Sequence, residues 1–181
     1  MKMIRNIILC FAIAGFSIQC SSQNDSKLPD DRGYIVKTGQ IAPDFTINFT
    51  NGNPAKKLSD YRGKIVMLQF TASWCKVCIQ EMPHIESRIW QPLKGKGLVL
   101  FGVDRKEKPG EVIKFAGKMK ISYPLILDEN GSIFEKYADP KAGVTRNVII
   151  DREGKIVFLT RLFDENEFNE MVKKIEELLN E

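Results

Sequence analysis

The stretch IVMLQFTASWCKVC, residues Ile65 to Cys78, decides the fold of this chain. Its first six residues form a nearly continuous apolar run of strand length, which indicates a strand covered on both faces. A C-x-x-C motif closes the stretch. Apolar residues at helical spacing come next: Ile79, Met82, Ile85 and Ile89. The pattern predicts a buried strand that leads directly into a helix, with both cysteines at the junction and with Pro83 kinking the helix.

The rest of the chain alternates between strand-like and helix-like segments. We predict a hairpin over 45–53, strands at 98–103 and 125–127, a helix over 112–119, a hairpin over 148–159 and a helix to 179 that opens on the capping box Asp164-x-x-Glu167. Helices between strands predict an α/β fold with a central sheet flanked by helices. The closing hairpin makes that sheet mixed, and the first hairpin is an N-terminal extension.

Length and composition suit one globular domain. The chain has 181 residues, of which 43% are hydrophobic and 28% charged, and this excludes an intrinsically disordered protein. The net charge of +4 falls to 25 basic against 23 acidic residues once 1–19 are left out. This small surplus gives no support to nucleic-acid binding.

The first 33 residues have the pattern of an export leader and a tether. Lys2 and Arg5 precede an apolar run of signal-peptide length, so we predict a signal peptide over 1–19. The run ends at SIQC, residues 17–20, which resembles the lipobox of bacterial lipoproteins and makes Cys20 a candidate lipidation site; plain cleavage and secretion is the alternative. We predict a flexible tether over 20–33 and a folded domain over 34–181.

The cysteine count favours redox chemistry over a structural role. Of four cysteines, Cys10 leaves with the signal peptide and Cys20 carries the lipid, so only Cys75 and Cys78 belong to the domain. One C-x-x-C is not the disulfide framework of a small exported protein, and closing so short a loop adds little stability. A structural metal site needs about four ligands. Two thiols and one histidine, His84, do not supply them, and we expect no metal and no organic cofactor.

The position of Cys75 favours a reactive thiolate. The N-terminus of a helix stabilises negative charge through its unpaired N–H groups and its dipole, and Lys76 adds a positive charge nearby. A free thiol of pKa about 8.5 is only a few per cent ionised at neutral pH, so such stabilisation decides its reactivity. We predict that Cys75 is the nucleophile and that Cys78, one helical turn further on, is the resolving cysteine.

The chain resembles the thioredoxin-like superfamily, and within it the membrane-tethered TlpA/ResA-type oxidoreductases with a redoxin, or AhpC-TSA-like, domain. The resemblance covers residues 37–181 and depends on these motifs: Gly39-x-x-Ala42-Pro43-Asp44-Phe45, Leu58-Ser59-Asp60-Tyr61-Arg62-Gly63-Lys64, Trp74-Cys75-x-x-Cys78, Glu81-x-Pro83 and Ile150-Asp151-x-x-Gly154-Lys155. It implies a thioredoxin-like fold and a thiol–disulfide oxidoreductase of the periplasm or cell envelope. It also implies protein disulfide substrates, an electron-donating membrane partner, a reducing direction and a monomer.

One departure from the family concerns the acid near the cysteines. Thioredoxin has a buried acid where this chain has Gln69, which cannot ionise. In the ResA-like branch an acid three residues after the second cysteine takes part, and Glu81 matches it. We therefore expect Glu81 to tune the resolving thiol and accept its proton; a solvated glutamate on the helix surface is the alternative. Glu81→Gln should then move the cysteine pKa values.

A second departure concerns the loop that faces the cysteines. The family has a cis-proline in a Gly-Val-Pro-like segment, and Thr145 takes its place here. A cis bond before a residue other than proline costs about 3–4 kcal/mol, so we predict a trans Val144–Thr145 bond. The resemblance still implies that Val144 and Thr145 line the substrate groove. Trp74 either flanks the thiol and shapes that groove or caps the core.

Two other functions fit the same sequence. A peroxiredoxin-like peroxidase would share the Ala42-Pro43-Asp44-Phe45 opening, but it needs Thr-x-x-Cys, and Cys75 occupies the threonine position. A non-enzymatic, tethered binding module with an inert disulfide is the other alternative. Disulfide turnover and the reduction potential separate these from an oxidoreductase.

Overall fold

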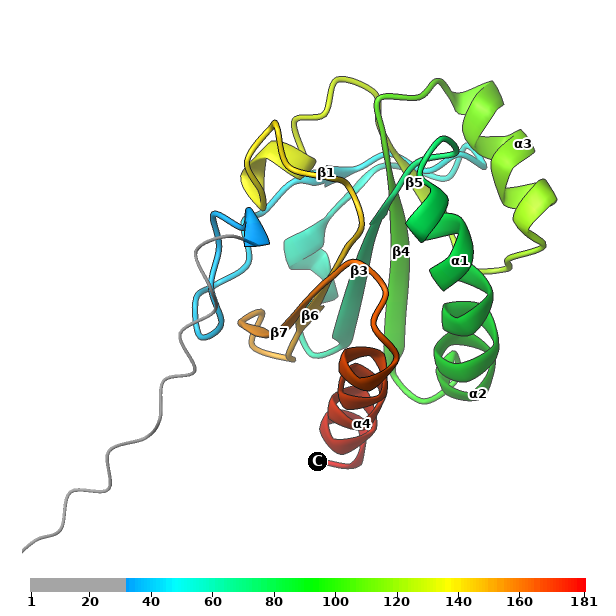
Figure 1. Ribbon diagram of the computed structural model, residues 1–181. Helices are drawn as coiled ribbons and strands as arrows, with labels where there is room; N and C mark the ends of the chain where they lie inside the picture. Colours follow the sequence, from blue (N-terminus) through cyan, green and yellow to red (C-terminus); the bar gives the residue numbers. More distant parts are fainter. Residues whose placement is uncertain (1–31) are drawn as a thin grey trace, which may run out of the picture.

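The strand of the deciding stretch, β3, is the central strand of a five-stranded sheet in the order β5-β4-β3-β6-β7. It pairs parallel with β4 and antiparallel with β6, so the sheet is mixed, as predicted. A separate two-stranded sheet, β1 with β2, forms the N-terminal hairpin (Figure 1). The strands are β1 Thr46–Ile47, β2 Lys56–Lys57, β3 Ile65–Thr71, β4 Leu98–Arg105, β5 Leu125–Asp128, β6 Arg146–Ile150 and β7 Ile156–Arg161.

The computed structural model describes residues 32–181. The predicted signal peptide, the lipidation site Cys20 and nearly all of the predicted tether lie outside these residues. Within them, no helix has the length and apolar character needed to cross a membrane. The helices are α1 Lys76–Ile85, α2 Gln91–Leu93, α3 Pro109–Met119 and α4 Glu165–Asn180, with 3-10 segments η2 Leu58–Tyr61 and η4 Phe134–Lys136 and a π-helical segment η3 Glu86–Trp90.

The two faces of the sheet are covered by different kinds of structure. Alternate residues of β3 point to opposite faces: Ile65 and Met67 pack with α1, α3 and α4, whereas Leu68 and Phe70 pack with the N-terminal segment, β1, η2 and η4. The longer helices therefore share one face (Figure 1). Every residue of β3 is buried, which explains why its sequence shows a continuous apolar run rather than alternation.

Pro83 lies inside α1, which continues to Ile85, and the geometry changes from α to π at Glu86, three residues after the proline. One local expectation needs correction. At α4, Asp164 accepts the backbone N–H of Glu167 at 3.0 Å, as a capping box requires. The Glu167 carboxylate does not return that bond; it accepts the Arg161 N–H at 3.2 Å and pairs with Arg32. Half of the predicted box forms because a tertiary ion pair competes for the glutamate.

Candidate active site

Cys75 and Cys78 lie where β3 leads into α1, as predicted, and their sulfur atoms form a disulfide. Cys75 is the N-cap residue of α1, and its sulfur accepts the backbone N–H of Cys78 at 3.2 Å. Cys75 is 8% exposed and Cys78 is fully buried. The helix terminus therefore offers a donor to the more accessible sulfur, as a nucleophilic thiolate needs.

The hydroxyl of Thr145 lies beside both sulfurs. Its Oγ1 is 3.1 Å from Cys75 Sγ and 3.3 Å from Cys78 Sγ. The described residues contain no cis peptide bond, so Val144–Thr145 is trans, as predicted. Thr145 and Val144 are each 3% exposed, and Val144 packs in the core on the β1 side of the sheet. Where the family has a ring without a donor, this chain has a hydroxyl that can donate to a sulfur.

The surface next to the cysteines carries two exposed apolar side chains. Trp74 is 61% exposed, which contradicts the alternative in which it caps the core. Leu162 is 46% exposed, and its backbone N–H donates to the carbonyl of Thr145 at 3.3 Å. Leu162 also has a φ of 68°, an uncommon value for a branched residue. No local sequence signal marks Leu162, because only the pairing of β7 with β6 brings it to the Thr145 loop.

Glu81 is buried on α1 and is not a solvated glutamate. It is 1% exposed; its Oε1 accepts from Asn147 Nδ2 at 2.6 Å and its Oε2 from Gln69 Nε2 at 3.3 Å. Burial raises the pKa of Glu81 to about 7, although the two amide donors act in the opposite direction. A carboxyl group with this pKa can both hold and release a proton near neutral pH.

Two residues that hold the Glu81 network did not stand out in the sequence. Asn147 on β6 also donates to Thr160 Oγ1 at 2.8 Å, and Tyr123 donates to Gln69 Oε1 at 2.7 Å, so Gln69 is oriented with its amide nitrogen toward Glu81. A polar residue inside the buried run 146–150 is a signal that could have found Asn147, because buried polar groups need partners. Nothing comparable marks Tyr123.

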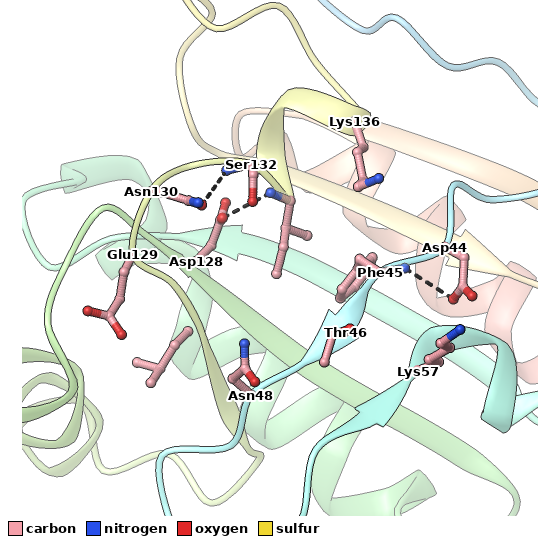
Figure 2. A pocket seen from close by; sticks show the side chains of 12 residues that line it. Asp44, Phe45, Thr46, Asn48, Lys57, Asp128, Glu129, Asn130, Ser132 and Lys136 are labelled. Carbon is pink, nitrogen blue, oxygen red and sulfur yellow. Dashed lines mark hydrogen bonds between the residues drawn. The ribbon is translucent and has the colours of Figure 1, made fainter.

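Away from the cysteines, a cavity of about 590 Å³ lies between β1 and the turn after β5 (Figure 2). None of the predicted site residues lines it. Asp44 accepts from the hydroxyl and the N–H of Ser59, and Asp128 accepts the N–H groups of Ile133 and Phe134 at 2.9 Å. These carboxylates hold a turn and a loop together.

The histidine and the possible metal ligands lie away from any metal-binding arrangement within the described residues. His84 lies against the ring of Phe163, with ring centroids 4.8 Å apart, and near Phe168. Among residues 32–181, no three His, Cys, Asp or Glu side chains are grouped so that they could hold a metal ion.

Fold and site together define a thioredoxin-like redox protein, and the comparisons with known proteins agree. The AhpC/TSA family model matches residues 38–159, and the chain belongs to this family. The thiol-disulfide oxidoreductase ResA of Geobacillus thermodenitrificans is 31% identical over 150 residues, which cover 83% of this chain and 80% of that protein. The predicted TlpA/ResA-type resemblance is therefore confirmed.

Solved structures give the same result. A candidate protein disulfide isomerase from Bacteroides thetaiotaomicron has a TM-score of 0.79 and 55% identity, covering 82% of this chain and 94% of that one. The thioredoxin domain of a thiol-disulfide oxidoreductase from Bacteroides vulgatus has a TM-score of 0.65 and 25% identity, covering 77% and 97%. With the Cys75–Cys78 pair in place, the chain is a thiol–disulfide oxidoreductase.

Proposed function

We propose that this oxidoreductase reduces disulfides in exported proteins. The Cys75 thiolate attacks one sulfur of a substrate disulfide, forms a mixed disulfide and releases the other sulfur as a thiolate. The Cys78 thiolate then attacks Cys75 Sγ and releases the second substrate thiolate. Two electrons pass to the substrate, and the Cys75–Cys78 pair ends as a disulfide. The observation that carries this proposal is the Cys75 sulfur at the N-cap of α1, which accepts the Cys78 N–H at 3.2 Å.

Glu81 accepts the proton that Cys78 must lose before it attacks. Its position supports this role, because it lies one helical turn after Cys78 on α1, buried, with a pKa of about 7. When ionised, Glu81 opposes a second negative charge on Cys78. In the resting dithiol, Cys78 therefore keeps its proton until it passes that proton to Glu81 and attacks Cys75. A potential near that of thioredoxin, about −270 mV, is expected, and one near that of DsbA, about −120 mV, would contradict the reducing direction.

Thr145 donates its hydroxyl to whichever sulfur is anionic. The support is its distance of 3.1 Å from one sulfur and 3.3 Å from the other. Thr145→Val removes the hydroxyl at nearly constant volume and should raise the pKa of Cys75 by about one unit, as expected for a lost hydrogen bond to a charged group. Thr145→Ser keeps the hydroxyl and is the control. Identical alkylation-versus-pH curves for Thr145→Val and the wild type would exclude this role.

Substrate polypeptide binds across Trp74, Val144, Thr145 and Leu162. The exposure of Trp74 and Leu162 beside a redox-active sulfur supports an apolar contact on each side of the substrate cysteine. Trp74→Ala and Leu162→Ala should raise KM for a protein substrate more than they lower kcat.

In the cell envelope, the chain is anchored by a lipid on Cys20 and works as a monomer. The leader and the lipobox-like segment 17–20 support export and anchoring. A membrane thiol–disulfide partner returns the Cys75–Cys78 pair to the dithiol, since a reductant must be recharged after each turnover. Mass spectrometry of the mature N-terminus tests the anchor: Cys20→Ser should abolish lipidation and release the protein from membranes.

Covalent trapping tests the proposed exchange. Cys78→Ser should stop the reaction at the mixed disulfide and capture substrate proteins on Cys75, in bonds that dithiothreitol cleaves. The double variant Cys75→Ser/Cys78→Ser is the matched control and should capture nothing. If Cys78→Ser captures no more than the control, and the wild type does not reduce insulin, the binding-module alternative holds. Hydrogen peroxide consumption faster than insulin reduction would favour the peroxidase.

A further inference from the structure

Asp104 is a buried carboxyl group that the proposed reaction does not use. It lies on β4 opposite Thr71, the last residue of β3 before the active-site loop. Its side chain is fully buried, and neither carboxyl oxygen has a hydrogen-bond donor within the described residues. An ionised carboxylate in such surroundings is strongly unfavourable. These surroundings therefore favour the protonated, uncharged form of the Asp104 carboxyl group.

Glu107, in the loop after β4, connects Asp104 to the active-site loop. Its carboxylate accepts the backbone N–H of Ser73 at 2.6 Å and also the Ser73 hydroxyl. After burial, the negative charge of Glu107 contributes most to the raised pKa of Asp104, so the two carboxyl groups lie near each other. Two ionised carboxylates cannot bond to each other, but a protonated one can donate to its neighbour. The chain of contacts thus runs from Asp104 through Glu107 to Ser73, two residues before Cys75.

The charged groups around Asp104 favour its protonated form. Burial raises its pKa to about 8, and the acids Glu107, Glu111 on α3 and Asp128 on β5 add to the effect. The nearest basic residue in the sequence, Arg105, lies on the opposite face of β4, where it donates to the Pro140 carbonyl and stacks on Phe134. Asp104 thus keeps its proton at neutral pH.

We propose that Asp104 is a positioning residue of the exchange reaction: its carboxyl group donates to Glu107, and Glu107 holds Ser73 and the backbone that presents Trp74 and Cys75. This inference rests on the exchange activity proposed for Cys75. Loss of the Asp104 proton places two negative charges side by side, and Glu107 moves away from Asp104. The Ser73 backbone then loses its anchor, and the active-site loop becomes less ordered at alkaline pH.

The test compares two variants at the same position. Asp104→Asn keeps a donor for Glu107 and cannot ionise, whereas Asp104→Leu has no donor. Hydrogen exchange of the Ser73 amide is measured between pH 6 and 9.5. In the wild type it should rise about tenfold above pH 8 beyond the ordinary base-catalysed increase, as expected when a hydrogen bond to a charged group is lost. Asp104→Asn should show no such extra rise, and Asp104→Leu should exchange fast at every pH.

The link to the reaction is tested with the pH profile of insulin reduction. The wild-type kcat/KM should fall above pH 8, and Asp104→Asn should remove this fall. If Asp104→Leu does not fold, Ser73→Ala, which removes one of the two bonds to Glu107, should give intermediate exchange at neutral pH. Equal extra exchange in Asp104→Asn and the wild type would overturn the proposal. If the exchange pattern holds but insulin is not reduced by any form, the proposed function fails and the positioning network stands.

Discussion

Glu81 and Asp104 are two buried carboxyl groups on the helix-covered face of the same sheet, and they are accommodated in opposite ways. Glu81 receives two amide donors, from Gln69 and Asn147. Asp104 receives none within the described residues, and the acid Glu107 nearby disfavours its charged form. Burial raises the pKa of both, to about 7 and about 8. Burial sets the direction of the shift, but the partners decide whether the group can also exist as an anion.

The two acids therefore suit different roles near the cysteines: proton transfer for Glu81 and a structural role for Asp104. Glu81 can ionise in place, because its anion keeps two donors, and a group of this kind can take a proton and return it. Asp104 has no such support, so its proton acts as part of the structure. Variants that change the charge or the hydrogen-bond partners of Glu81 and Asp104 test this difference directly.

The largest expected effect is the pH dependence of stability. Both groups have folded pKa values above their unfolded ones, so the stability that they contribute is lost as pH rises from about 4 through about 7 for Glu81 and about 8 for Asp104. Each contributes a slope of about 1.4 kcal/mol per pH unit within its window. Urea unfolding between pH 5 and 9 measures this slope.

Variants assign that slope to the two groups. Glu81→Gln should remove the part that ends near pH 7, and Asp104→Asn the part that ends near pH 8. The double variant should be nearly flat across both windows. A slope unchanged in Asp104→Asn would show that Asp104 is ionised in the folded protein at neutral pH, and the contrast with Glu81 would disappear.

Asn147→Leu should have the next largest effect. It leaves the Glu81 anion with one donor and the Thr160 hydroxyl without its amide partner. We expect a loss of about 3 kcal/mol in the free energy of unfolding at pH 8 and a smaller loss at pH 5, where Glu81 is protonated. Because removing both partners relieves the unpaired charge, Asn147→Leu/Glu81→Leu should lose less than the sum of the single variants. Strict additivity would disprove this coupling.

Tyr123→Phe tests a residue that contacts Glu81 only indirectly, through Gln69. It removes the hydroxyl that donates to Gln69 Oε1 at 2.7 Å, which lets the amide turn away from Glu81. The expected loss is about 1 kcal/mol, with a small rise in the pKa of Glu81. Tyr61→Phe, on the opposite face of the sheet, is the control. NMR titration of the Glu81 side chain reports the pKa, and the same value in both variants would place Tyr123 outside the network.

The smallest effect is expected at the start of α4, far along the chain from both acids. Asp164→Ala removes the side chain that accepts the Glu167 N–H and should cost about 1 kcal/mol at every pH. Because no buried acid changes its partner, the pH slope and the alkylation-versus-pH curve of Cys75 should stay as in the wild type. A shifted curve here would mean that general loss of stability, not local charge, controls the thiol.

Local patterns in the sequence were enough where one segment contains the whole signal. The apolar run at β3, followed at once by the C-x-x-C motif, predicted the central strand, the helix start and the cysteine pair. They failed where a partner arrives from elsewhere. Glu167 was assigned to its own helix cap but bonds to Arg161 and Arg32 instead.

The sequence by itself determined the chemistry of this protein, because a thiol pair at a strand–helix junction is a local arrangement that neighbouring residues specify. Only the tertiary structure decided the surroundings of that pair. Thr145 reaches the sulfurs, Asn147 reaches Glu81 and Glu107 reaches Ser73 across 70, 66 and 34 positions of the chain. The physical reason is that hydrogen bonding and desolvation act over a few ångströms in space, so the pKa values of buried groups depend on which distant segments the sheet brings together.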